Sequence, residues 1–139
     1  MSDTHAIRST LVPEDQRLDI TADLFGAHFP LRLEPVIYGI TDRMAPEYHG
    51  GYWHFYALDN GGFYMAPDND KCFLVQSSNC WQGELSADAL GITACLATYS
   101  HLSFSGDPVF SRTCAEHYHL LREFIYQHPE VAAILGAID

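Results

Sequence analysis

The sequence predicts an α+β fold: a small antiparallel sheet of three to four strands packed with about four helices. Side chains alternate in YWHFYAL, as they do in a strand, whose successive residues point to opposite faces of the sheet. Apolar residues at helical spacing mark the segments before and after the strands. The length of 139 residues suits one domain, and we find no linker or internal repeat. We therefore expect residues 1–139 to form a single compact domain.

The first predicted helix follows Pro13 in EDQRLDITADLFG, where a proline and two acidic residues favour a helix start and Gly26 favours its end. Three residues share the face that we expect to be buried: Leu18, Ala22 and Phe25. The next segment, HFPLRLEPVIYGITDRMAP, has three prolines and a glycine among apolar pairs. This pattern predicts an irregular connection with one edge strand over 36–40.

The predicted sheet begins with YWHFYAL, whose side chains alternate between two faces. The face that we expect to be buried carries Trp53, Phe55 and Ala57, and the other carries Tyr52, His54, Tyr56 and Leu58. DNGG at 59–62 supplies the side chains and the positive-φ residues of a hairpin turn, and FYMA returns until Pro67. After a second polar turn, CFLVQS is the third predicted strand of the sheet, and NCWQGEL is a candidate fourth.

Three helices are predicted after the strands. Ser86 is placed to cap the first of them, and Asp88 lies in its first turn, at the positive end of the helix dipole. SGDP interrupts the chain, and a longer helix then covers about 109–127 until His128 and Pro129 end it. A short helix closes the chain within PEVAAILGAID. The first two helices have these predicted inward residues: Ile92, Cys95, Leu96 and Tyr99, then Cys114, Tyr118, Leu121, Phe124 and Ile125.

The composition excludes some classes of function. Eighteen acidic residues against seven basic ones give a net charge of −11. A protein that grips phosphates needs a basic patch, and here Lys and Arg are scattered singly, so we expect no direct binding to nucleic acid. The acidity suits solubility or a partner with a basic surface, such as a DNA-handling enzyme. Without an apolar leader, a membrane-span stretch or CxxC spacing, we expect a cytoplasmic protein with reduced cysteines.

Candidate metal ligands lie close together in Cys114, His117 and His119. On a helix, however, residue 119 points about 160° away from 117, so the three cannot converge, and we expect neither metal nor cofactor. The stretch Asp68–Asp70 begins like a calcium loop but lacks the later Gly and Glu, so a turn is expected. No nucleophile elbow, P-loop or dinucleotide motif is present, so nothing in the motifs specifies an enzyme.

Two features remain as candidate interaction surfaces. Seven aromatic residues crowd into 47–67, but no Lys or Arg lies between Arg43 and Lys71, so core packing explains them better than base stacking. Acidic residues form the second feature. They are Asp15, Asp19 and Asp23, spaced four residues apart on the first predicted helix, and the C-terminal Asp139. Such a row could imitate phosphates, although three charges are few and solvation of a helix face is the better explanation.

Long blocks of the sequence resemble a known family. RMAPEYHGGYWHFYALDNGGFYMAP, FLVQSSNCWQGELSADALGITACLATYSHLSF, CAEHYHLLREFIYQHPE and the final ILGAID are similar to antirestriction proteins of the ArdB/KlcA type, over about 36–139. The resemblance implies a small bacterial cytosolic α+β protein of plasmids or other mobile elements. Such a protein relieves host type I restriction of unmodified DNA while sparing methylation. It has no known enzymatic activity or cofactor, and no functional residue is carried over.

Three hypotheses of function follow, for a protein that we expect to be a monomer. The first is an inhibitor that acts, directly or indirectly, on the translocating restriction complex or on DNA-processing machinery that follows it. The second is an acidic mimic of DNA that occupies a basic channel. The third is a hydrolase built on His54, His101 and a cysteine. Salt dependence distinguishes the first two, because mimicry weakens steeply with ionic strength.

Overall fold

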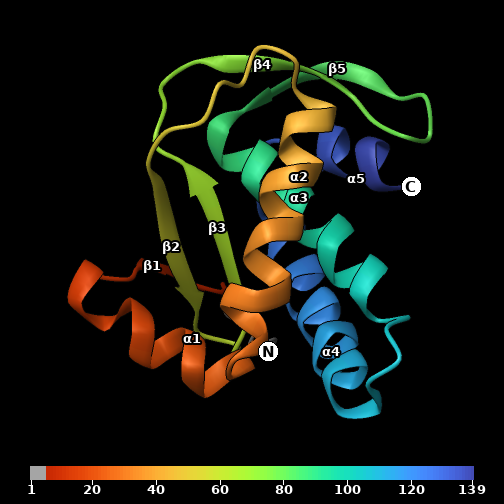
Figure 1. Cartoon of the computed structure of the whole chain (residues 1–139). Coiled ribbons are helices and arrows are strands. Elements are labelled where there is room, and N and C mark those ends of the chain that lie inside the picture. The colour runs from red at the N-terminus through yellow and green to blue at the C-terminus, as the bar shows by residue number, and fades with distance from the viewer. Residues whose placement is uncertain (1–5) are drawn as a thin grey trace, which may run out of the picture.

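The computed structural model describes residues 6–139, which contain five α-helices and two small antiparallel sheets (Figure 1). The predicted α+β class is therefore confirmed. Residues 1–5 lie outside the described residues. The parts of two predictions that cover them, the single domain over 1–139 and the absence of an apolar leader, are therefore outside the described structure.

The first sheet contains β1 (Ser9–Leu11), β2 (Trp53–Leu58) and β3 (Phe63–Pro67), in the order β1-β2-β3. All neighbours are antiparallel, and Phe55 stands opposite Met65. The sequence analysis missed β1, because three residues are too few to show an alternating pattern.

The predicted faces of β2 are confirmed at the aromatic positions. Trp53 and Phe55 are buried, Tyr52 is exposed, and His54 and Tyr56 are half-buried. The predicted faces are wrong at the end of the strand, where Ala57 is half-buried and Leu58 is buried. The aromatic residues of this hairpin pack mainly into the core, where Phe55 and Phe63 meet edge to face with ring centroids 5.6 Å apart. The aromatic window is thus a sheet and its core, as its composition predicted.

The hairpin turn at residues 59–62 also forms as predicted. Gly61 adopts a φ of 94°, which a side chain would disfavour. The Gly62 N–H donates to Asn60 Oδ1 at 2.9 Å, and Asn60 Nδ2 donates to the Leu120 carbonyl at 2.9 Å. The turn is therefore tied to the helix that carries Leu120.

The second sheet is a separate pair, β4 (Cys72–Gln76) and β5 (Gln82–Ser86), so the prediction that CFLVQS joins the first sheet is wrong. The reason lies at the outer edge of β3. Cys95 Sγ accepts from Met65 N–H at 3.5 Å, and Tyr99 O–H donates to the Phe63 carbonyl at 2.8 Å. Both side chains come from a helix, which therefore occupies backbone groups that another strand would need.

The predicted edge strand over 36–40 is wrong as well, because these residues belong to helix α2 (Glu34–Met44). Pro35 lies in the first turn of α2, where a missing N–H breaks no helical hydrogen bond. A π-helical segment, η2 (Phe29–Leu33), leads into it. The prolines thus mark the start of a helix instead of preventing one.

The first predicted helix is split into a 3₁₀ turn, η1 (Glu14–Gln16), and α1 (Arg17–Phe25). Its predicted buried face is wrong in part: Phe25 is buried, but Leu18 is 84% exposed and Ala22 is exposed. Only the last turns of α1 reach the core, where the Phe25 ring packs 5.7 Å from that of Phe63. Leu18 has the right helical angle but no neighbouring element to pack against.

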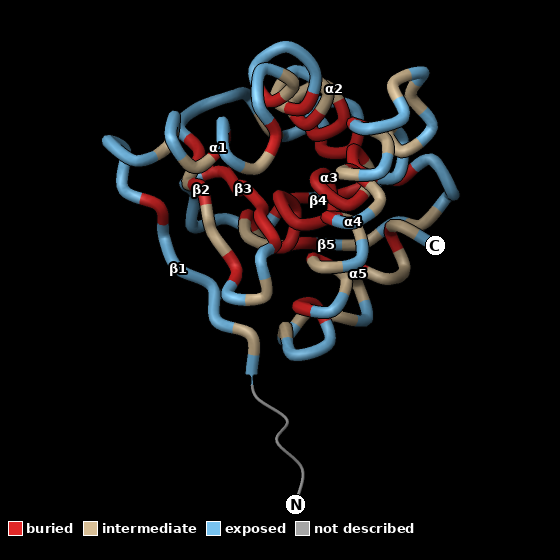
Figure 2. The backbone as a smooth tube through the Cα atoms, turned by 90° about the horizontal axis from the view of Figure 1, so that it is seen from below, coloured by how far each residue is buried: buried red, intermediate tan, exposed pale blue. Residues whose placement is uncertain are grey.

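Helix α3 (Ala87–Leu102) is the centre of the fold and packs against β3, α2, α4 and α5 (Figures 1 and 2). The four predicted inward residues of α3 are buried, and so are most residues on its other sides. The predicted cap is confirmed, since the Ala89 N–H donates to Ser86 Oγ at 3.1 Å. Gly91 lets α3 approach the sheet, because a methyl group there would lie 2.4 Å from the Met65 carbonyl oxygen.

Helices α4 (Pro108–Ile125) and α5 (Val131–Ile138) complete the chain near the predicted bounds. Asp107 caps α4 by accepting from the backbone N–H groups of Val109 and Phe110, each at 3.1 Å. The predicted inward residues of α4 are buried, except Tyr118, which is half-buried.

Candidate functional site

The acidic residues of the first predicted helix are all exposed, but they do not form one helical row. Asp19 and Asp23 lie one turn apart on α1, whereas Asp15 lies in the preceding 3₁₀ turn. A 3₁₀ turn advances by three residues instead of 3.6, so Asp15 departs from the expected spacing. The structure keeps these carboxylates in solvent and places two of the three on the same helix.

Asp139, the other acidic candidate, is engaged by the protein itself. Its Oδ1 atom lies 3.4 Å from Arg122 Nη1, which also donates to the Tyr118 hydroxyl at 3.1 Å. The pair joins the end of α5 to α4. An exposed pair of this kind contributes about 0–1 kcal/mol, which is similar in size to the cost of about 0.3–1 kcal/mol for an anion at the negative end of a helix dipole.

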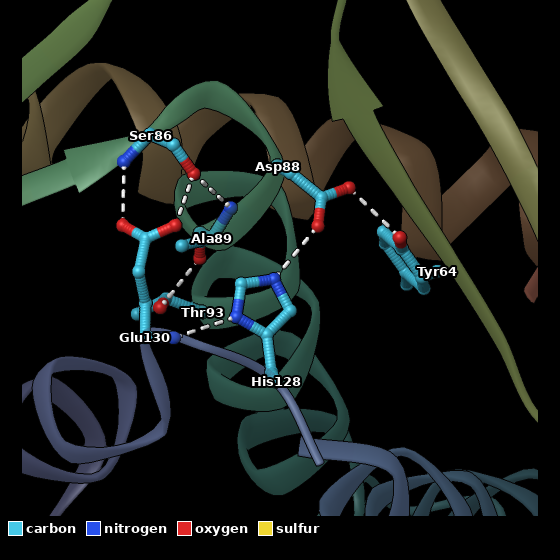
Figure 3. A network of polar contacts seen from close by, with 7 residues as sticks. All are labelled: Tyr64, Ser86, Asp88, Ala89, Thr93, His128 and Glu130. Atoms are coloured by element: carbon cyan, nitrogen blue, oxygen red, sulfur yellow. Dashed lines mark hydrogen bonds and ion pairs between the residues drawn. The ribbon is translucent and has the colours of Figure 1, made fainter. Parts of the chain in front are cut away.

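A polar network surrounds the first turn of α3 (Figure 3). Glu130, just before α5, accepts from the Ser86 N–H at 2.9 Å and from Ser86 Oγ at 2.5 Å. The same Oγ accepts the Ala89 N–H of the helix cap. With its proton donated to Glu130 and a lone pair used by the cap, the Ser86 hydroxyl is a structural group.

The second half of the network centres on Asp88. Its Oδ2 atom lies 2.9 Å from His128 Nε2, and its Oδ1 atom accepts from the Tyr64 hydroxyl at 2.8 Å (Figure 3). Because the Glu130 N–H donates to His128 Nδ1 at 3.0 Å, the hydrogen bonds assign the proton of a neutral ring to Nε2. Burial raises the pKa of Tyr64, which keeps its proton on the hydroxyl. The network joins β3, α3 and the link between α4 and α5.

Sequence reasoning missed this network. It placed Asp88 only as an acidic residue in a first helical turn and His128 only as a helix end. Their meeting depends on how the α4–α5 link returns to the start of α3, for which no local pattern gives a signal.

The histidines of the hydrolase hypothesis do not share a site. His54 lines a cavity of about 260 Å³ beside β2, where its Nε2 atom lies 3.2 Å from Asp68 Oδ1. His101 lies in the last turn of α3 and lines a different hollow. Neither lining includes a cysteine.

Asn69, next to Asp68, accepts from the Lys71 N–H at 2.8 Å, which confirms the turn predicted at residues 68–70.

The buried thiols are poor nucleophiles. Burial raises the pKa of Cys95 to about 12 and that of Cys114 to about 11, so both stay protonated at neutral pH. His117, one turn beyond Cys114, is 5% exposed, and burial lowers its pKa to about 4. His119 is exposed, as its helical angle requires. Within residues 6–139, no three His, Cys, Asp or Glu side chains converge as metal ligands.

None of the helices between residues 6 and 139 combines the length and the apolar character needed to cross a bilayer.

Known proteins resemble this chain over nearly its whole length. The antirestriction protein KlcA of Escherichia coli is 40% identical over 136 residues, which cover 96% of this chain and 95% of KlcA. The putative antirestriction protein YubI of E. coli K12 is 37% identical over 132 residues, which cover 92% and 93%.

A solved structure is similar in fold as well as in sequence. It has a TM-score of 0.90 and 40% identity, covering 100% of this chain and 99% of that one. It is described as the structure of KlcA and ArdB proteins, with a novel fold and antirestriction activity against type I DNA restriction systems in vivo but not in vitro. The family model of antirestriction proteins matches residues 46–139, in agreement with the resemblance seen in the sequence. The chain belongs to the antirestriction protein family.

Proposed function

We propose that this protein relieves type I restriction of incoming unmodified DNA in the bacterial cytoplasm, while methylation continues. The observation that carries this proposal is the full-length similarity, at a TM-score of 0.90, to proteins described as active against type I systems in vivo. The chain covers 99% of that structure, so the whole fold of the relative is available for the same task.

We propose that the action is an interaction with a protein, or an indirect effect, instead of catalysis. Side chains with catalytic potential serve structural roles: Ser86 caps a helix, and both ring nitrogens of His128 are hydrogen-bonded. Cys95 and Cys114 are protonated by burial. These engagements favour a binding protein that needs no cofactor.

The partner that we propose is a component of the restriction machinery or of the DNA processing that follows it. The relatives act in vivo but not in vitro. A purified restriction reaction lacks the other proteins of the cell, so dependence on one of them would account for this difference. Protection of incoming DNA through such a protein would suit a gene that is carried on a plasmid or another mobile element.

The test is the plating efficiency of unmodified phage on a type I restricting strain, with and without the protein. We expect a rise on the restricting strain and no change on a matched strain without the restriction subunit. Progeny phage should be methylated, which a second passage on the restricting strain measures. Plating that stays low, or progeny that lose modification, would contradict the proposal.

Mimicry of DNA is the second candidate, favoured by the net charge of −11 and by the exposed carboxylates of Asp15, Asp19 and Asp23. A mimic competes with DNA for a basic channel, so its binding to a purified DNA-handling enzyme should fall steeply as salt rises. Inhibition that is insensitive to salt would favour the first candidate.

A further inference from the structure

A groove of about 910 Å³ lies between α2 and α3. The turn between β4 and β5 and the last residues of α5 also border it. Small side chains keep it open, including Gly39 on α2 and Ala97 and Ser100 on α3. Its volume is at the upper end of the range for sites that bind small molecules, about 300–1,000 Å³, so a peptide side chain and its neighbours would fit.

The groove combines apolar walls with a polar rim. Val36 of α2, Ala97 of α3 and Ile138 of α5 offer apolar surface, and the exposed serines at 78 and 100 offer hydroxyl groups. Arg43 and His101 are the basic residues of the lining. Of the described residues that line it, none is Asp or Glu, although acidic residues outnumber basic ones by 18 to 7 in the chain.

Arg43 is the feature that points to a ligand. Arg17 and Arg122 bond to groups of the protein: Arg17 donates to the Trp53 carbonyl at 2.8 Å, and Arg122 pairs with Asp139. Arg43 is exposed, and nothing within residues 6–139 forms an ion pair or a hydrogen bond with its guanidinium. A free guanidinium above an apolar groove suits a carboxylate, which it can bind through two parallel hydrogen bonds.

We propose that this groove binds a segment of a protein partner that presents an apolar side chain next to a carboxylate. The apolar side chain would lie between α2 and α3, and the carboxylate would pair with Arg43, with His101 beside it. The acidic remainder of the surface repels such a segment, so charge directs it to this groove. Only the identity of the partner, as a component of the restriction or DNA-processing machinery, rests on the proposed function.

Two substitutions test the groove without disturbing the fold. Gly39→Leu fills it, and no atom lies within 4 Å of the position that its Cβ would take. Arg43→Glu reverses the charge at the rim. Matched controls outside the lining are Asp42→Leu, also on α2, and Arg112→Glu on α4, both at exposed positions. Thermal melts should show all four variants folded.

The probe is a displayed library of random twelve-residue peptides, selected on the wild-type protein with counter-selection on Gly39→Leu. We expect the enriched peptides to combine apolar residues with Asp or Glu. In fluorescence anisotropy, a labelled selected peptide should bind Gly39→Leu and Arg43→Glu at least about tenfold more weakly than it binds the wild-type protein. It should bind the two control variants about as well as wild type. No enrichment, enrichment of basic peptides, or equal binding to the filled groove would overturn the inference.

The plating assay separates this inference from the proposed function. Loss of restriction relief in Gly39→Leu and Arg43→Glu, with relief by both controls, supports the groove as the site of the partner. If wild type and all four variants relieve restriction equally, the groove inference is wrong and the proposed function stands. If the wild type relieves nothing, the proposed function fails, while the peptide measurements still decide whether the groove binds.

Discussion

Gly91 offers the sharpest test of how α3 meets the first sheet. In Gly91→Ala, the added methyl group would lie 2.4 Å from the Met65 carbonyl oxygen and 2.5 Å from Ala66 Cα, closer than real contacts allow. Because backbone atoms of β3 must move, we expect the overpacking to cost an amount in the upper part of the usual range, about 2–3 kcal/mol or more. Alanine regains up to about 1 kcal/mol through its helix propensity. The free energy of unfolding should therefore fall by about 1–2 kcal/mol or more.

Gly39→Ala is the matched control, since Gly39 lies inside α2 and a methyl group there would meet no atom within 4 Å. Helix propensity then acts alone, and we expect a gain of about 0.5–1 kcal/mol. Urea unfolding of both variants, at equal m-values, measures the two changes. If Gly91→Ala were as stable as wild type, or gained stability like Gly39→Ala, α3 could not lie directly on β3.

Four further predictions concern the core, pH, the acidic surface and metals. Trp53→Ala and Phe55→Ala should each lower stability by about 3–5 kcal/mol, and Tyr52→Ala and His54→Ala by less; the reverse ranking in thermal melts would contradict the assigned faces. Burial lowers the pKa of His117 from 6.5 to about 4. As pH falls, the unfolded chain therefore binds a proton at this residue before the folded chain does. The free energy of unfolding should fall by up to about 3 kcal/mol as pH drops from about 6.5 towards 4. His117→Leu should flatten that part of the stability curve, and an unchanged curve would refute the assignment. If an acidic surface contacts a basic partner, changing Asp15, Asp19 and Asp23 together to Asn, or removing Asp139, should abolish restriction relief with nearly unchanged melting temperature; full relief by both would eliminate the acidic surface. Chelators and mild oxidation should leave restriction relief intact, and stoichiometric zinc in elemental analysis of the purified protein would oppose this.

Several elements were predictable because their causes are local. The alternation from Trp53 to Leu58 and the turn residues that follow specify a hairpin within a dozen residues. The Ser86 cap depends on one side chain and a backbone N–H three residues later. The long blocks that resemble antirestriction proteins were also readable in the chain itself, and the matches over residues 46–139 agree with them.

Other features depend on which elements meet, and the tertiary structure decided them. Cys95 and Tyr99 occupy the edge of β3, so β4 and β5 pair with each other, which no pattern in CFLVQS could show. Burial of His117, the bond between Asp88 and His128, and the groove beside Arg43 likewise arise between distant segments. Sequence periodicity specifies which side of an element is apolar, whereas long-range packing decides what that side contacts and which polar groups are left for a partner.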